Sequence, residues 1–195
     1  METIKSKIEE YNAAVDEVLG DDYYLLSTFE PASDSDLEQL KQHVGFELPK
    51  ELIQFYKTFG GLKNIDNEES YCFSISTIST TRDLGLIEMI RYSWGFDRYE
   101  FDEGENFTAE EIKQLNSNYK CIGWYRDDTV CESAYYIFFD KDGNFGELFY
   151  DQDCFNDAYK VLKKLLKNEF EKTTLENILV KALEQTKDTL IMWNE

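Results

Sequence analysis

Apolar residues recur every three or four positions along several stretches of the chain, which is the spacing of an amphipathic helix. In the first stretch Ile4, Ile8 and Tyr11 fall on one stripe, and Gly20 follows as a residue that can end a helix. The spacing predicts helices over about 3–19, 35–44, 49–59, 109–116 and 155–170, and a last helix that begins near Leu175. We expect the apolar end of that last helix, 190–193, to pack against the rest of the protein.

Local signals mark the ends of some of these helices. Ser35 and Glu38 form a capping-box pattern, in which each side chain satisfies a free amide of the first turn, and Thr108 and Glu111 repeat the pattern. Gly45 can end the helix that begins near Ser35, because glycine adopts a left-handed conformation without steric cost.

The most specific stretch of the sequence is 45–61. It reads as the end of one helix at Gly45, a second helix whose first turn suits Pro49, and a stop at Gly60-Gly61. Apolar residues are too dense in the second helix for a narrow stripe, so we expect this helix to be largely buried.

A second periodicity, alternation of apolar with polar residues, predicts strands. The segment 71–76 alternates in this way and indicates a strand with one buried face. Residues that are β-branched or aromatic predict three more strands, over about 121–125, 133–139 and 145–150. Asp142-Gly143 separates the last two and is a hairpin signal. The segment 84–94 is ambiguous, because its apolar spacing suits a helix but includes a glycine.

Three segments follow one another in an order that is specific although each is degenerate. They are Gly45-Phe46-x-Leu48-Pro49 with Phe55-Tyr56 and Gly60-Gly61, then Ala134–Asp140 with Gly146–Asp151, and finally Phe155–Leu162. Together they resemble the SUKH superfamily over about residues 30–168. The resemblance implies an α+β fold with an antiparallel, curved sheet and packed helices. An insert at about 94–118 and extra helices at both ends depart from the compact family pattern.

For bacterial members, the resemblance implies a non-enzymatic immunity protein that neutralises a polymorphic toxin, often a nuclease. Eukaryotic relatives include a fungal regulator of cell-wall synthesis, so a regulatory or scaffold protein-binding module is the alternative function. The family has no catalytic residues to transfer to this chain. We therefore expect no enzymatic activity, no cofactor and no bound metal.

Length and charge narrow the class of partner. The 195 residues suit one domain, 1–195, with an aromatic-rich core. Forty acidic and twenty basic residues give a net charge of −20. Phosphate backbones and anionic membranes repel such a surface, whereas a basic protein is attracted to it. Acidity also keeps proteins soluble, so the net charge alone supports two interpretations equally, a basic partner and a simple role in solubility.

The cysteines and the N-terminus indicate a cytoplasmic protein. Cys72, Cys121, Cys131 and Cys154 contain no CxxC pair, so a zinc ribbon or redox motif is disfavoured. The first residues lack an apolar signal core, and no run is long enough to span a membrane. Cys121 and Cys131 flank a possible hairpin, but a reducing compartment disfavours a disulfide between them.

Two candidates for chemistry have simpler structural interpretations. His43 is the single histidine, and its place near the end of an amphipathic helix suits a cation at a helix C-terminus. Asp140-Lys141-Asp142-Gly143-Asn144 resembles the start of a calcium loop, but the glycine and glutamate of an EF-hand are missing at their positions and strands flank it. We interpret it as a hairpin turn.

The acidic insert is our first choice for a partner-binding surface, although a solvated loop would show the same composition. Aromatic residues inside a charged rim are typical of tight interfaces, and Tyr99, Phe101 and Phe107 lie among carboxylates here. We predict charged contacts from Asp102, Glu103 and Glu105 with Tyr99 and Phe101 as anchors, and Asp127 and Asp128 as a second surface.

Overall fold

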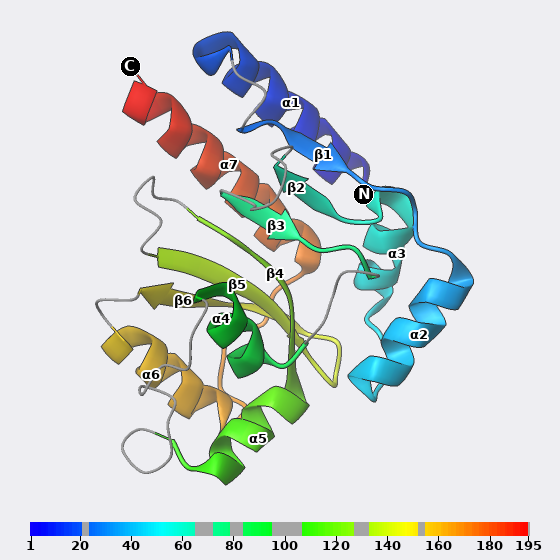
Figure 1. Ribbon diagram of the computed structural model, residues 1–195, viewed down its shortest axis with the longest axis vertical. Coiled ribbons are helices and arrows are strands. Elements are labelled where there is room, and N and C mark those ends of the chain that lie inside the picture. The colour runs from blue at the N-terminus through cyan, green and yellow to red at the C-terminus, as the bar shows by residue number, and fades with distance from the viewer. Residues whose placement is uncertain are drawn as a thin grey trace.

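The computed structural model describes residues 1–20, 24–64, 72–78, 84–94, 107–126, 133–151 and 155–194 (Figure 1). The helices in these ranges are α1 (Glu2–Leu19), α2 (Asp34–Val44), α3 (Lys50–Phe59), α4 (Leu86–Trp94), α5 (Ala109–Asn118), α6 (Phe155–Leu165) and α7 (Leu175–Asn194). The strands are β1 (Leu26–Thr28), β2 (Leu62–Asn64), β3 (Phe73–Ile75), β4 (Tyr119–Tyr125), β5 (Ser133–Asp140) and β6 (Phe145–Asp151).

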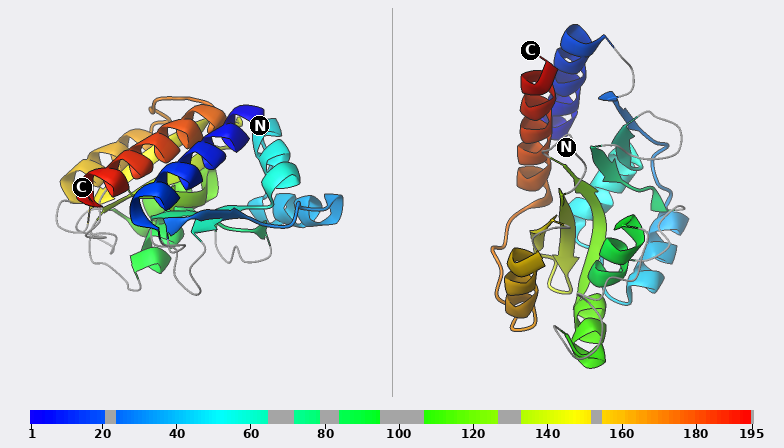
Figure 2. Two further views of the ribbon diagram at one scale, coloured as in Figure 1. Left: turned by 90° about the horizontal axis from the view of Figure 1, so that it is seen from above. Right: turned by 60° about the vertical axis from the view of Figure 1, so that its left-hand side comes forward.

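The strands form one six-stranded sheet in the order β1-β2-β3-β4-β5-β6, and every neighbouring pair is antiparallel. Strands β4 to β6 are longer than β1 to β3, and a register shift interrupts β4 between Cys121 and Gly123. The sheet is curved, with helices packed against it (Figure 2). The predicted α+β fold with an antiparallel curved sheet is therefore confirmed.

Strand β5 shows how the two sides of the sheet are used. Ile137 and Phe139 point into a cluster that joins α1, α2, α3 and α7 to strands β1 to β3 and to one side of β4 to β6. Tyr136 and Phe138 point into a second cluster on the other side, which joins α4, α5 and α6. Successive side chains of a strand face opposite sides, so β5 holds both clusters together.

Helices α1 and α7 lie side by side and run in the same direction (Figure 2). The N-terminal amino group of Met1 is 3.2 Å from Glu176 Oε2, and Lys7 Nζ is 3.1 Å from Glu184 Oε1. Both pairs join the first helix to the last one. The apolar stripe of α1 is buried in this contact, as its periodicity predicts.

Several helix ends agree with the sequence. Gly20, Gly45 and Gly60 all adopt left-handed conformations directly after helices, as predicted. The capping box of Thr108 and Glu111 is present at the start of α5. The ambiguous segment 84–94 contains helix α4, and the hairpin turn at Asp142-Gly143 joins β5 to β6.

Two local predictions are wrong. The capping box of α2 is formed by Ser33 and Asp36, two residues before the predicted pair of Ser35 and Glu38. Strand β3 is buried on both faces instead of one, since even Ser74 is only 8% exposed. The reason is that Ser74 lies opposite Trp124 of β4, whose side chain packs against an apolar cluster, so this face of the strand is covered as well.

Two valines of α1 provide a matched test of the α1–α7 contact. Val15 is fully buried, whereas Val18 is 40% exposed. We expect Val15→Ala to lower the free energy of unfolding by about 2 kcal/mol, because it removes buried methyl groups and leaves a cavity. Val18→Ala should change it by less than about 0.5 kcal/mol. Urea denaturation followed by circular dichroism measures both values, and equal effects would contradict the assigned packing.

Candidate partner-binding surface

The residues that the sequence favours as partner contacts fall in two segments outside the described residues. Tyr99, Phe101, Asp102, Glu103 and Glu105 lie in segment 95–106, and Asp127 and Asp128 lie in segment 127–132. Their roles therefore stay predictions. The described residues on either side show where each segment joins the fold.

The first segment rejoins the fold at Phe107, which is buried against α6. Its ring centroid is 5.3 Å from that of Tyr159, and Lys163 Nζ lies 4.4 Å from the centroid of Phe107. Phe107 is 1% exposed, so the sequence interpretation of this ring as a surface aromatic is wrong. Its burial attaches the end of this segment to α6.

An ion pair strengthens the same attachment. Lys163 Nζ of α6 lies 2.7 Å from Glu111 Oε1 of α5, and the other oxygen of this carboxylate accepts a hydrogen bond from the amide of Thr108 at 2.8 Å. The hydrogen bond from Lys163, followed by that from Thr108, lowers the pKa of the Glu111 carboxyl. Helices α5 and α6 are thus joined by a charge pair as well as by an aromatic contact.

The second segment follows Arg126, which lies at the end of β4. The amide of Arg126 donates to the carbonyl of Cys72 at 2.8 Å, and its carbonyl accepts from Thr186 Oγ1 at 3.0 Å. Its guanidinium carbon is 4.7 Å from the ring centroid of Trp124. The chain therefore enters segment 127–132 beside α7 and the beginning of β3.

A hollow of about 610 Å³ lies beside β6, between α6 and α7. The chain that links these two helices passes around the edge of the sheet (Figure 1), and four of its residues line the hollow. The lining side chains are Glu147 of β6, Val161 and Lys164 of α6, Glu169, Phe170, Glu171 and Thr173 of the link, and Asn177, Ile178 and Lys181 of α7.

The carboxylate of Glu147 is compensated by its neighbours. It accepts a short hydrogen bond from the Tyr125 hydroxyl and lies 2.8 Å from Lys181 Nζ. Lys181 Nζ is also 5.3 Å from the ring centroid of Tyr135, which stacks on Tyr125 at 4.9 Å. This group therefore holds α7 against the sheet.

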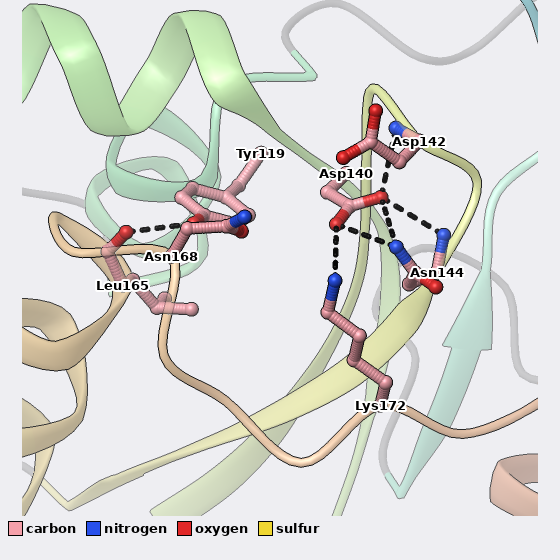
Figure 3. Close-up of polar contacts among 7 residues, drawn as sticks. All are labelled: Tyr119, Asp140, Asp142, Asn144, Leu165, Asn168 and Lys172. Carbon is pink, nitrogen blue, oxygen red and sulfur yellow. Dashed lines mark hydrogen bonds and ion pairs between the residues drawn. The ribbon is translucent and has the colours of Figure 1, made fainter.

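The link between α6 and α7 is fixed at several points. Phe170 packs edge-on against Tyr119 with centroids 5.9 Å apart, and the Tyr119 hydroxyl donates to the carbonyl of Leu165 at 2.6 Å (Figure 3). Asn168 has a φ of 59° and accepts from the same hydroxyl at 3.3 Å. Thr173 pairs with Phe145 through two backbone hydrogen bonds of 3.0 and 3.4 Å. The wall of the hollow is thus held in place.

The Asp140 carboxylate is used inside its own hairpin turn (Figure 3). One oxygen accepts from the amides of Asp142 and Asn144, both at 2.9 Å, and the other accepts from Asn144 Nδ2 at 2.9 Å. Lys172 Nζ approaches to 4.0 Å. The interpretation of this motif as a hairpin turn is confirmed. Within the described ranges, no three His, Cys, Asp or Glu side chains are placed to hold a metal ion.

The model of the SMI1/KNR4 family (SUKH-1) matches residues 31–171, which is most of the chain. The chain belongs to this family. No curated protein and no solved structure matched the chain. The superfamily includes immunity proteins and is generally non-enzymatic. Among the described helices, none has the length and apolar character needed to cross a membrane.

The SUKH-1 segments that carry the resemblance meet in space. Phe46 packs edge-on against Phe139 with centroids 5.8 Å apart, and Gly143 of the hairpin lies over Pro49. Glu51 of α3 accepts a hydrogen bond from the amide of Leu175 at 2.8 Å and so caps α7. These family residues build the fold, since each is engaged in packing or capping.

The remaining candidates for chemistry have structural roles. His43 is exposed in the last turn of α2, where a cation is favourable. Cys121 is a free, fully buried thiol, and burial raises its pKa to about 12. Burial, assisted by the charge of Asp140, also raises the pKa of Tyr119 to about 12. Neither Cys121 nor Tyr119 is ionised at neutral pH, so neither is an activated nucleophile.

Sequence reasoning missed Glu147 and Lys181 of the hollow. One signal was present, because alternation places Glu147 on the same side of its strand as Phe145 and Phe149. A carboxylate between two aromatic side chains indicates a paired charge. Lys181, however, lies on α7, and the sequence does not indicate that this helix packs beside β6.

Glu111 and its exposed neighbour Glu110 test the α5–α6 attachment. Because the pKa of Glu111 is lowered on folding, its stabilisation is present above the ordinary value of 4.5 and is lost as the pH falls below it. Glu111→Gln should cost about 0.5–1 kcal/mol at pH 7 and almost nothing at pH 3. Glu110→Gln should cost little at either pH. Chemical denaturation at both pH values measures this, and a loss that persists at pH 3 would exclude the ion pair as its source.

Proposed function

We propose that this SUKH-1 protein is an immunity protein that binds a cognate toxin and neutralises it without chemistry. The observation that supports this most is family membership combined with a net charge of −20. A basic toxin domain, of which a nuclease is the class that fits best, would be attracted to such a protein. The protein would act in the cytoplasm, where its thiols stay reduced.

The distribution of charge along the chain supports a basic partner. Segment 95–106 contains five acidic residues and one base, Arg98, and segment 127–132 contains three acids and no base. Segment 95–106 lies between α4 and Phe107, just before α5, and segment 127–132 lies between β4 and β5. We propose these two segments as the surfaces that contact the toxin.

Neutralisation by such a surface needs only competition. A nuclease binds its substrate through cations that contact phosphates, and an acidic protein bound to those cations excludes the substrate. Opposite fields also raise the association rate, which matters when a toxin must be captured before it acts. Complementary charged surfaces then supply the free energy of binding, and no catalytic group is required.

The alternative is a regulatory or scaffold module that binds host proteins. Co-expression with a toxin gene that lies beside this gene distinguishes the two. An immunity protein restores growth to cells that produce the toxin and forms a one-to-one complex with it in analytical ultracentrifugation. Unrestored growth and no complex would contradict immunity and favour the module.

Charge reversal tests which surface is used. Asp102→Lys, Glu103→Lys and Glu105→Lys combined should slow association with the toxin at low salt by about tenfold or more and flatten its salt dependence. The matched control reverses the exposed residues Glu9, Asp16 and Glu17 of α1, which gives the same change in net charge. Stopped-flow or surface plasmon resonance measures both variants. Equal slowing by the two would mean that net charge, and not the insert, guides association.

A further inference from the structure

The edge of β6 presents backbone groups in a fixed alternation. The amide and carbonyl of Phe145 bond to Thr173 of the α6–α7 link, so they point away from β5. Asp140 and Asn144 bond to each other across the hairpin, which sets the same alternation from the turn. Because antiparallel strands alternate inward and outward pairs, the backbone groups of Glu147 and Phe149 also point outward.

These outward groups are not used by the part of the chain that the structure describes. No backbone or side-chain hydrogen bond is present at the outward amide or carbonyl of Glu147 or Phe149 within it. Glu147 is the residue of β6 that lines the hollow of about 610 Å³. The hollow therefore has an open strand edge at its base, between the two helices.

The α6–α7 link does not continue along the edge of β6, because beside Gly146 it passes from one face of the sheet to the other. Phe170 enters the second apolar cluster there, 5.4 Å from Phe138 between ring centroids. A Cβ added to Gly146 would lie 2.6 Å from Phe138 and 2.9 Å from Phe170, so a glycine is required for the crossing. The strand position beside Phe145 is filled by Thr173, and the positions beside Glu147 and Phe149 are left open.

We propose that an extended, basic segment of the partner protein pairs with Glu147 and Phe149 and becomes a seventh strand of the sheet. Main-chain hydrogen bonds to an open edge supply affinity in this mode, and side chains on either side supply specificity. The identity of the partner as a toxin rests on the function proposed above. The binding mode rests on the strand register and the hollow.

Charge and shape select this occupant. Glu169 and Glu171 on the link are exposed, and neither has an ion-pair partner in the described ranges, whereas Lys164 is the single such cation in the lining. A lysine or arginine on the incoming strand would pair with these carboxylates. A second copy of this chain is disfavoured, because α6 and α7 flank the edge and the net charge of −20 repels.

Proline and alanine at position 147 separate the backbone from the side chain. Glu147→Ala and Glu147→Pro both remove the carboxylate, but only proline removes the outward amide. Since this amide makes no bond to β5, proline breaks no hydrogen bond of the sheet, and edge strands tolerate it. Circular dichroism and melting temperature should therefore be similar for the two variants.

The probe is a display library of random twelve-residue peptides, selected on the immobilised wild-type protein. We expect enriched peptides to carry Lys or Arg in an alternating pattern. They should bind Glu147→Ala with nearly wild-type affinity and Glu147→Pro at least about tenfold more weakly. Equal binding to the two variants, or no enrichment over an uncoated surface, would overturn the proposal.

Hydrogen exchange keeps the test valid if the proline variant is poorly folded. With the wild-type protein, a selected peptide should slow exchange of the amides of Glu147 and Phe149 and leave that of Leu148, already bonded to β5, unchanged. Unchanged exchange at 147 and 149 would overturn the proposal.

The toxin used in the co-expression assay then separates this proposal from the proposed function. Equal toxin binding by the alanine and proline variants would reject the strand mode while immunity stands. A wild-type protein that binds selected peptides at the edge, but no toxin, would reject immunity while the strand mode stands.

Discussion

The structure depends on one constraint, which is that the sheet must be covered on both faces. In β5 every residue except Tyr135 is buried, so neither side of this strand can face water. Antiparallel sheets often leave one face solvated, but this one needs two helical layers. Helix α6 covers one side and α7 the other, and the link between them must therefore pass around the edge at β6. The hollow beside β6 is a consequence of that crossing.

The same constraint explains why elements outside the family match are integral to the fold. The match ends at residue 171, yet α7 supplies Leu179 and Ala182 to the main apolar cluster. Helix α1 lies before the match and contributes Tyr11. Glu51, inside the match, caps α7 through the amide of Leu175. The shared core therefore relies on the two terminal helices for part of the cover on one of its faces.

The sequence alone predicts well those features that neighbouring residues determine. A helix stop at Gly60, for example, needs only a residue that accepts a left-handed conformation. The start of α2 shows the limit of such local prediction, because Ser33 with Asp36 and Ser35 with Glu38 both satisfy the capping pattern. Tertiary bonds select the first pair, since the amide of Ala32 donates to the carbonyl of Tyr56 and holds the chain extended up to that point.

Predicting the site requires information that no single segment of the sequence contains. Segment composition separates strand β6 from helix α7, but only the folded register shows that Glu147 meets Lys181 and that its amide faces outward. The prediction that Phe107 lies at the surface was wrong for a related reason. Its acidic neighbours in the sequence suggest a surface, whereas the ring that covers it, Tyr159, is far away along the chain.

The buried polar groups of the fold are used in hydrogen bonds to the backbone. Asn64 Oδ1 accepts from the amides of Cys72 and Phe73 at 3.1 and 2.9 Å, and Asn116 Oδ1 accepts from that of Ile87 at 2.8 Å. Asp140 is satisfied inside its turn. A buried polar side chain that bonds the backbone in this way stabilises the fold. At the surface, the outward backbone groups of Glu147 and Phe149 make no hydrogen bond within the described residues, and Glu169 and Glu171 of the link are exposed there. A partner strand of the kind proposed above would complete both the sheet and these charge pairs.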